Sequence, residues 1–167
     1  KIHMLKNHGM CPDTKYHHPV AGFNNRMTNI QAAIGVAQIS KLDTILQKRR
    51  QIAQWYEQYL GPLRDQGILA FQPVAPYAQV NYWFFSIMLR EDIDRDEIGK
   101  ILRQHGVDNR PFFKPVHKQE CYREYAHYGL PVTDRISRQG LNLPTYHQLT
   151  EQDIVNICAI ISNVLTL

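Results

Sequence analysis

The chain has 167 residues, of which 44% are hydrophobic and 20% charged, an ordinary globular balance that allows a buried core. Nineteen Lys and Arg against fifteen Asp and Glu give a formal charge of +4, without the long basic runs or zinc-finger spacings of nucleic-acid binders, so we expect a small anionic ligand rather than nucleic acid. Three scattered cysteines (Cys11, Cys121, Cys158) indicate neither a disulfide framework nor a metal site.

Residues 1–27 are rich in His, Gly and Pro, a composition typical of an irregular connection rather than of a domain. The sequence opens without an initiator Met or a signal peptide, and no apolar run reaches the roughly 18 residues that a membrane span needs. We therefore expect a cytoplasmic protein without membrane contact. We also expect a fragment that begins inside a longer protein. The histidines of this region do not lie together on one rigid element, so we expect no metal ligands among them.

A long amphipathic helix is predicted over residues 28–61, because apolar residues recur at three- and four-residue intervals from Ile30 to Leu60. Thr28 and Gln31 form a capping-box pattern at its start, and Gly61-Pro62 predicts its end. Such a helix would be about 45 Å long, which suits a bridge between two domains. The basic run 48–50 is typical of a solvated helix face.

The rest of the chain predicts a small α/β domain. Residues 80–89 are dense in aromatic and β-branched side chains and predict a buried strand, while 107–113 and 140–144 predict further extended segments. Asp94 predicts the cap of a short helix that ends at His105-Gly106. Leu149, the cap Thr150 and a following apolar stripe predict the last helix.

Polar residues are concentrated just before the long helix, in the stretch 22–29. A turn and a helix cap account for Gly22 and Thr28, but they give no reason for Asn24 or Arg26. A solvated turn is the simpler interpretation. Amide donors, a helix dipole and a guanidinium nevertheless make such a helix start a good place for a phosphate group.

A second basic group lies along an extended segment and consists of Arg110, Lys114, His117 and Lys118. Alternation places Arg110, Phe112 and Lys114 on one face of it. On composition alone, a solvated edge with a hydrogen-bonded histidine explains this group as well as a binding site does.

A family resemblance decides between these interpretations. Residues 22–35, Gly-Phe-Asn-Asn-Arg-Met-Thr-Asn-Ile-Gln-Ala-Ala-Ile-Gly, resemble a segment of the DegT/DnrJ/EryC1/StrS sugar aminotransferases, and the similarity continues through 110–117 and 140–144. The resemblance implies the C-terminal part of a type I pyridoxal-phosphate-dependent aminotransferase, an α/β fold. We therefore expect 1–27 to be the tail of the large cofactor domain, 28–61 a bridging helix, and 62–167 the small domain, with a short sheet and flanking helices.

The resemblance also implies roles for individual residues. In a homodimer, Asn24 would reach the phosphate of pyridoxal 5'-phosphate in the neighbouring subunit. The nucleotide-sugar substrate would contact four residues, which are Arg26, Arg110, Lys114 and His117. No lysine of this chain stands in the family's Schiff-base context, so we expect no catalytic residue here and no activity from the chain alone. Asn25 departs from the family's usual Tyr at that position.

The implied reaction transfers an amino group, normally from glutamate as the amino-acid donor, to a 4-keto nucleotide sugar such as GDP-4-keto-6-deoxymannose. Two alternatives stay open from the sequence. A branch of the family replaces the lysine with histidine and dehydrates the sugar instead. The chain could also be a non-catalytic dimerisation or binding module that lacks the lysine domain.

Overall fold

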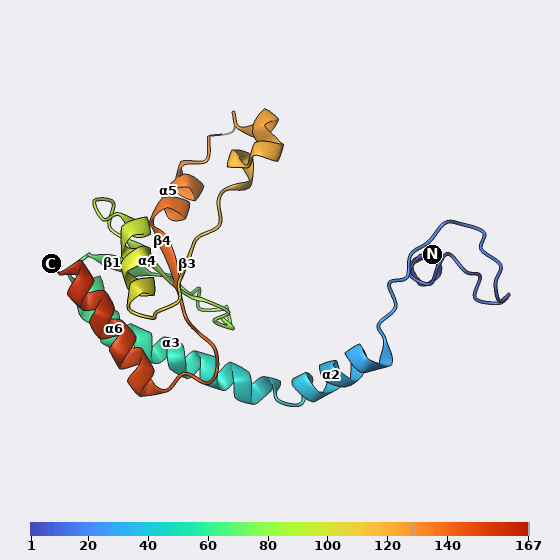
Figure 1. Ribbon diagram of the computed structural model, residues 1–167, viewed down its shortest axis with the longest axis horizontal. Helices are drawn as coiled ribbons and strands as arrows, with labels where there is room; N and C mark the ends of the chain where they lie inside the picture. The colour runs from blue at the N-terminus through green and yellow to red at the C-terminus, as the bar shows by residue number, and fades with distance from the viewer. Residues whose placement is uncertain (128, 167) are drawn as a thin grey trace. The chain divides into compact units, whose positions relative to one another are not determined.

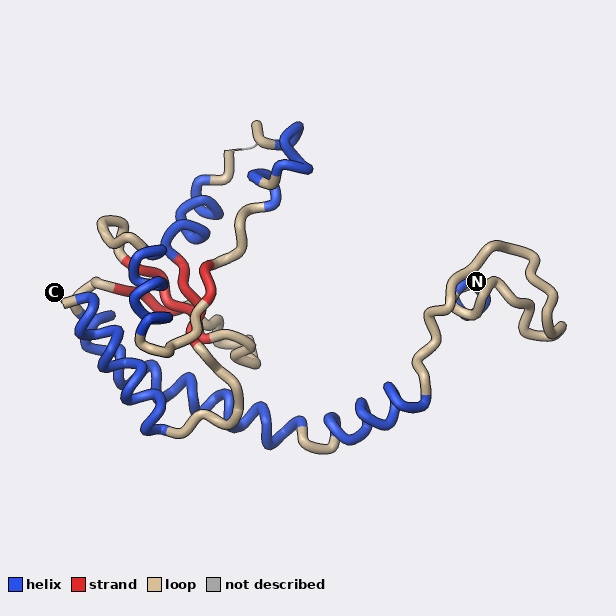
Figure 2. Tube along the Cα trace, in the orientation of Figure 1, coloured by secondary structure: helices blue, strands red, loops and turns tan. Residues whose placement is uncertain are grey.

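The computed structural model describes residues 1–127 and 129–166, which form two compact units, Lys1–Asp43 and Thr44–Leu167 (Figure 1). The first unit contains the short helix α1 (Ile2–Leu5), a long loop and the helix α2 (Asn29–Ile39). The second contains a four-stranded sheet with helices packed against it (Figure 2). In the described part of the chain, no helix is both long and apolar enough to cross a membrane.

Helix α2 begins where the sequence predicts. The Thr28 hydroxyl accepts a hydrogen bond from the Gln31 backbone N–H at 3.2 Å, and the Gln31 side chain accepts one from the Thr28 N–H at 2.8 Å. This reciprocal pair is the predicted capping box. No residue of α2 is buried in the described chain, however, so its apolar side chains face outward.

The prediction of a single helix over 28–61 is wrong, because α2 ends at Ile39 and a second helix, α3 (Leu42–Asp65), follows it. The Ser40 hydroxyl donates to the Ala37 carbonyl at 3.0 Å, which competes with helical pairing at this point. The apolar stripe itself continues through Val36, Ile39 and Leu42, so the break between the helices is not visible in the apolar spacing.

The predicted stop at Gly61-Pro62 is wrong as well, since α3 continues through both residues. Leu63 is buried in the core and keeps the last turn helical. The helix ends instead at Asp65, and Gly67 in the turn that follows has a φ of 72°. The Ile68 N–H reaches the Leu63 carbonyl at 3.0 Å, and the Gly67 N–H reaches the Arg64 carbonyl at 2.9 Å, a Schellman pattern.

The sheet is antiparallel, with strand order β1-β2-β4-β3. Its strands are β1 (Leu69–Phe71), β2 (Phe85–Leu89), β3 (Arg110–Pro111) and β4 (Gly140–Leu143). Strand β4 lies within the predicted extended segment 140–144. Strand β2 is shorter than predicted, because residues 80–84 form a turn rather than its first half.

Helices connect and cover these strands. Helix α4 (Arg95–Gln104) has the predicted Asp94 cap and ends before Gly106, and α6 (Glu151–Leu165) starts at the predicted Thr150 cap. Between β3 and β4 lie two 3-10 helices, η1 (Val116–Lys118) and η2 (Glu120–Tyr125), and α5 (Pro131–Gln139). The predicted α/β fold with a short sheet and flanking helices is confirmed.

The core lies between α3, α4, α6 and the sheet. The Tyr56 ring stacks on the Phe85 ring at a centroid distance of 4.8 Å, which joins α3 to β2. The alternating residues Phe85, Ile87 and Leu89 are buried, as expected of a strand with one face on the core. Cys158 of α6 is also buried there, and burial raises the pKa of its thiol to about 12.

Candidate functional site

The loop that carries Asn24 is held by backbone contacts with the segment after α1. The Phe23 N–H donates to the Leu5 carbonyl at 2.7 Å, the Asn25 N–H donates to the Lys6 carbonyl at 2.9 Å, and Asn24 pairs with Asn7 in an antiparallel bridge. The backbone on both sides of Asn24 is therefore fixed.

Two glycines permit this arrangement. A Cβ atom on Gly22 would collide with the backbone of Gly9, and a Cβ on Gly9 would collide with the Val20 carbonyl. Gly9 also has a φ of 71°, a conformation that glycine adopts without strain. Gly22 is thus required by close backbone packing, and not only by a turn.

The side chains of Asn24 and Arg26 are exposed. Within residues 1–127 and 129–166, no hydrogen bond or ion pair involves either of these side chains. The structure thus presents an amide and a guanidinium, two residues apart, on a fixed backbone. These groups are donors that an anion would satisfy.

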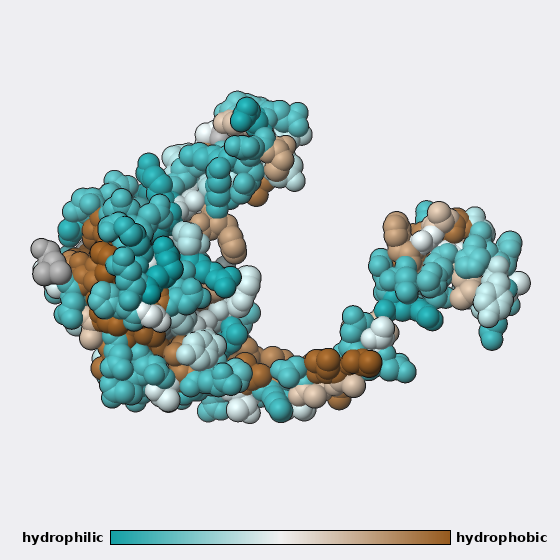
Figure 3. All heavy atoms as spheres, in the orientation of Figure 1, coloured by the Kyte–Doolittle hydropathy of each residue, from teal (hydrophilic) through white to brown (hydrophobic). Residues whose placement is uncertain are grey.

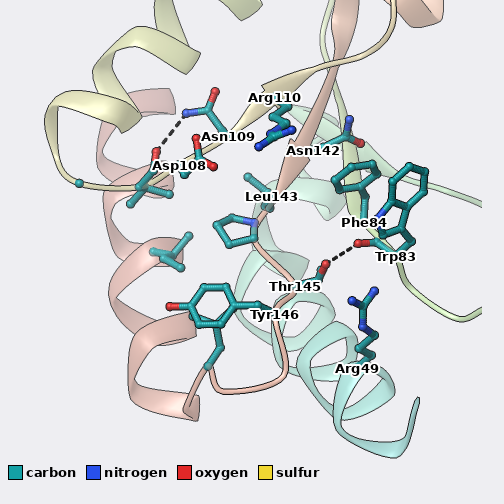
Figure 4. Close-up of a pocket in the computed structure, with 15 residues that line it drawn as sticks. Arg49, Trp83, Phe84, Asp108, Asn109, Arg110, Asn142, Leu143, Thr145 and Tyr146 are labelled. Carbon is teal, nitrogen blue, oxygen red and sulfur yellow. Dashed lines mark hydrogen bonds between the residues drawn. The ribbon is translucent and has the colours of Figure 1, made fainter. Parts of the chain in front are cut away.

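A pocket of about 510 Å³ opens in the second unit, between α3, the end of α4 and the segment after β4 (Figure 4). Its charged lining residues are Arg49, Asp108 and Arg110, and its aromatic lining residues are Trp83, Phe84 and Tyr146. Of the predicted site residues, Arg110 lines this pocket, whereas Lys114 and His117 do not.

One wall of the pocket is a strained turn. Tyr82 has a φ of 46°, which is unfavourable for a bulky residue. Hydrogen bonds hold the turn from two elements, because the Arg49 guanidinium donates to the Tyr82 carbonyl at 3.3 Å and the Thr145 hydroxyl donates to the Trp83 carbonyl at 2.6 Å. The Trp83 N–H also donates to the Asn81 side chain at 3.0 Å. The turn fixes Trp83, whose ring is 60% exposed and stacks on Phe84.

Buried amides fix the opposite wall. The Asn109 side-chain amide donates to the carbonyls of Gly99 and Val107, and its oxygen accepts from Arg103. The Asn142 oxygen accepts a hydrogen bond from the Ser86 hydroxyl at 2.7 Å. These contacts occupy Asn109 fully and give the loop before β3 a defined conformation.

His117 lies apart from this pocket and is buried in η1. Its Nε2 is 3.1 Å from Oδ1 of Asp134, while Nζ of Lys118 is 2.9 Å from the other carboxylate oxygen. The contact between His117 and Asp134 lacks the alignment of a hydrogen bond, so it is a charge contact when the ring is protonated. The Lys118 ammonium holds the pKa of the Asp134 carboxyl below its usual range.

Lys114 is exposed in the segment between β3 and η1. The predicted basic group is therefore divided in the structure, with Arg110 at the pocket and His117 in the Asp134 contact. Only Arg110 and Pro111 pair as a strand, so the predicted alternation does not extend along the whole segment.

Sequence reasoning missed Arg49, which was interpreted as part of a solvated helix face. It is partly buried, and it holds the Tyr82 turn. No local pattern distinguishes it from Arg50, because its partner is 33 residues away in the chain. Asp108 and Tyr146 were missed too, and only their positions after α4 and β4, at the ends of elements, could have drawn attention to them.

Comparisons with known proteins agree with this picture. A GDP-perosamine synthase from Caulobacter vibrioides is 38% identical over 167 residues, which cover 99% of this chain and 44% of that protein. Another from Vibrio cholerae is 33% identical, with 95% of this chain and 43% of that protein covered. The solved structure of ntda from Bacillus subtilis with bound cofactor PMP has a TM-score of 0.82 at 27% identity, and covers 98% of this chain and 38% of its own.

The chain thus spans less than half the length of these relatives. Within the sugar aminotransferases, residues 27–29 and Tyr82-Trp83 point towards the GDP-perosamine synthases, an expectation that the two relatives confirm. The family description matches residues 1–162, including every site residue predicted above. The chain belongs to the DegT/DnrJ/EryC1/StrS aminotransferase family.

Proposed function

We propose that this chain is the C-terminal part of a pyridoxal-phosphate-dependent enzyme that aminates a 4-keto nucleotide sugar, with GDP-4-keto-6-deoxymannose as substrate and glutamate as donor. The observation that carries the proposal is the fixed loop with Asn24 and Arg26, whose donors have no partner in the described chain. The similarity to GDP-perosamine synthases supports the choice of nucleotide sugar.

The residues present fit one end of the cofactor. The Asn24 amide is an exposed donor on a fixed loop, which suits a phosphate group. When bound, pyridoxal 5'-phosphate would supply the electron sink for moving the amino group. In this chain, Asn24 would hold the phosphate and Arg26 would face the substrate diphosphate as a fixed cation. We assign no residue of this chain as the Schiff-base lysine.

Helix α2 supports the placement of this loop against further protein. Ile30, Ile34, Val36 and Ile39 are all exposed on α2, and Figure 3 shows them as a hydrophobic surface on this helix. Apolar side chains gathered on one element mark an interaction surface. We propose that a second subunit of a homodimer covers this surface, so that Asn24 serves the cofactor of that subunit.

We propose that the other three residues bind the substrate and do not transfer protons. They are Arg110, Lys114 and His117. Arg110 is at a pocket and Lys114 is exposed, so both can meet an anion. His117 is buried beside Asp134, so we propose that it supports the substrate loop and contacts the sugar from its edge.

Turnover by the cofactor-loaded enzyme that contains this chain tests the proposal. Incubation with GDP-4-keto-6-deoxymannose and glutamate should yield a GDP-amino sugar and an equal amount of 2-oxoglutarate, measured by mass spectrometry. A dehydrated sugar without nitrogen would favour the dehydratase alternative. The absence of any sugar product would sink both enzymatic hypotheses.

Binding of the cofactor tests Asn24 separately. Asn24→Asp replaces a phosphate donor with a negative charge, so the Kd for pyridoxal 5'-phosphate should rise by about tenfold or more, since a hydrogen bond to a charged group is worth roughly 1.5–3 kcal/mol. Asn25→Asp adds the same charge one residue away and is the matched control. Equal losses in the two variants would show a general charge effect and contradict the assignment.

A further inference from the structure

The pocket of Figure 4 contains a carboxylate that its basic character does not explain. Arg49 and Arg110 make the lining cationic, yet Asp108 also lines it. Asp108 is exposed, and within residues 1–127 and 129–166 no ion pair or hydrogen bond engages its carboxylate. A carboxylate in a pocket that also holds two guanidinium groups suits a ligand that carries both donors and negative charge.

The charged groups are distributed along the pocket. In Figure 4, Asp108 and Tyr146 lie towards one side of the view, Arg49 and Trp83 towards the other, and Arg110 between them. Tyr146 is 55% exposed. One end of the pocket therefore holds a carboxylate and a tyrosine, the other end holds a guanidinium and Trp83, and a second guanidinium lies between them.

Guanine matches the first end. Its N1–H and its exocyclic amino group are adjacent donors, and a carboxylate accepts both at once, whereas uracil and thymine offer a single ring N–H between two carbonyls. An aromatic face stacks on the base at the same time, for about 1–3 kcal/mol per base.

Phosphate groups match the second end. A guanidinium binds phosphate oxygens through paired N–H groups, and Arg110 has no partner within the described residues. Arg49 uses one nitrogen for the Tyr82 carbonyl, which leaves its other donors available. The volume of about 510 Å³ lies in the range of ordinary small-molecule sites.

We propose that this pocket binds the guanosine diphosphate part of the substrate, with the base at Asp108 and Tyr146 and the phosphates at Arg110 and Arg49. The inference rests on the proposed function and extends it, because it assigns the choice of nucleotide to a carboxylate of this chain. Trp83, fixed by its strained turn, then forms the outer wall.

A base-exchange experiment tests the role of Asp108. Calorimetry on the cofactor-loaded enzyme should give a Kd for GDP at least tenfold lower than the Kd for UDP. Asp108→Asn should raise the Kd for GDP at least tenfold, and this variant should bind xanthosine diphosphate more tightly than the wild type does. Xanthine has a carbonyl where guanine has its amino group, so it pairs with an amide rather than with a carboxylate. Asp65→Asn, which changes an exposed carboxylate paired with Arg64, is the matched control.

Arg110→Met tests the phosphate end. The Kd values for GDP and for UDP should rise by the same factor, about tenfold, because both nucleotides carry the same diphosphate. Arg64→Met is the control, since Arg64 pairs with its neighbour Asp65, contacts the Phe71 ring and does not line the pocket. Circular dichroism checks that each variant is folded.

The outcomes separate this inference from the proposed function, because nucleotide binding requires no keto sugar and no amino donor. A GDP-to-UDP preference that is unchanged in Asp108→Asn overturns the inference, whatever the turnover. A preference that shifts to xanthosine diphosphate supports it, even if the enzyme aminates none of the sugars offered.

Discussion

The carboxylate of Asp134 contacts two side chains of η1, those of His117 and Lys118. The main cause of its lowered pKa is the hydrogen bond with Lys118. A carboxyl whose pKa is lower in the folded state stabilises the protein above its unfolded pKa of about 3.9, and that stabilisation is lost as the pH falls through the folded value.

Lys118→Met tests this contact. Removing the ammonium should move the pKa of Asp134 back towards its usual range and make the variant less stable than the wild type at pH 7. The difference should shrink as the pH falls below about 4, because Asp134 is then protonated in both proteins. Urea unfolding at several pH values measures this. Lys100→Met, which removes a looser and exposed partner of Glu97, is the control. A difference that does not vary with pH would refute the linkage.

At the scale of elements, β3 depends on a glycine in its neighbour. A Cβ atom on Gly140 of β4 would overlap the Phe112 ring, which follows β3 directly. The Phe112 N–H also donates to the Gly140 carbonyl at 3.1 Å. The ring therefore lies flat against the glycine, two residues from Arg110.

Gly140→Ala should displace Phe112 and move β3 with it. We expect a loss of about 1–3 kcal/mol in the free energy of unfolding, the usual result of overpacking. Chemical denaturation measures the loss, and Phe112→Leu in the same chain should recover part of it by making room. Gly35→Ala, on a helix where an added methyl meets nothing, is the comparison. Full additivity of the two changes would argue against the contact.

The sequence predicts the elements whose signals are local. The capping box at Thr28, the caps at Asp94 and Thr150 and the end of α4 before Gly106 all depend on residues within a few positions of each other. The errors arise from distant partners. The turn at Tyr82 interrupts a strand-like sequence because Arg49 and Thr145 bind its carbonyls, and Pro62 stays helical because Leu63 is buried.

The short β1 and the helix α5 were not predicted. Three residues are too few to show an alternating pattern, and β1 is defined by its pairing with β2. Helix α5 had a usable signal, since Pro131 occupies its first turn, where proline is well tolerated. For the site, the resemblance pointed to five residues, which are Asn24, Arg26, Arg110, Lys114 and His117. The gathering of Asp108 with Arg49 became visible only in three dimensions.

At the scale of the whole molecule, the apolar surface of α2 is the feature that calls for a partner. Ile34 is 59% exposed, and no residue of α2 is buried within residues 1–127 and 129–166. We expect Ile34→Glu to turn a dimeric enzyme into a monomer, because a charge would be buried at the interface. Light scattering after size-exclusion chromatography measures the mass. Gln104→Glu, an equal charge change at the exposed end of α4, should leave the dimer intact. A dimer that survives Ile34→Glu would place the interface elsewhere.

The buried thiol of Cys158 has a practical consequence for chemical labelling of the protein. With its pKa raised to about 12, almost none of it is thiolate at neutral pH, and alkylating reagents react with thiolates. Cys121, by contrast, is exposed on η2. A fluorescent maleimide should therefore attach at Cys121 long before Cys158. The slow rate of labelling at Cys158 would then measure how often the core opens, in the native protein and without denaturant.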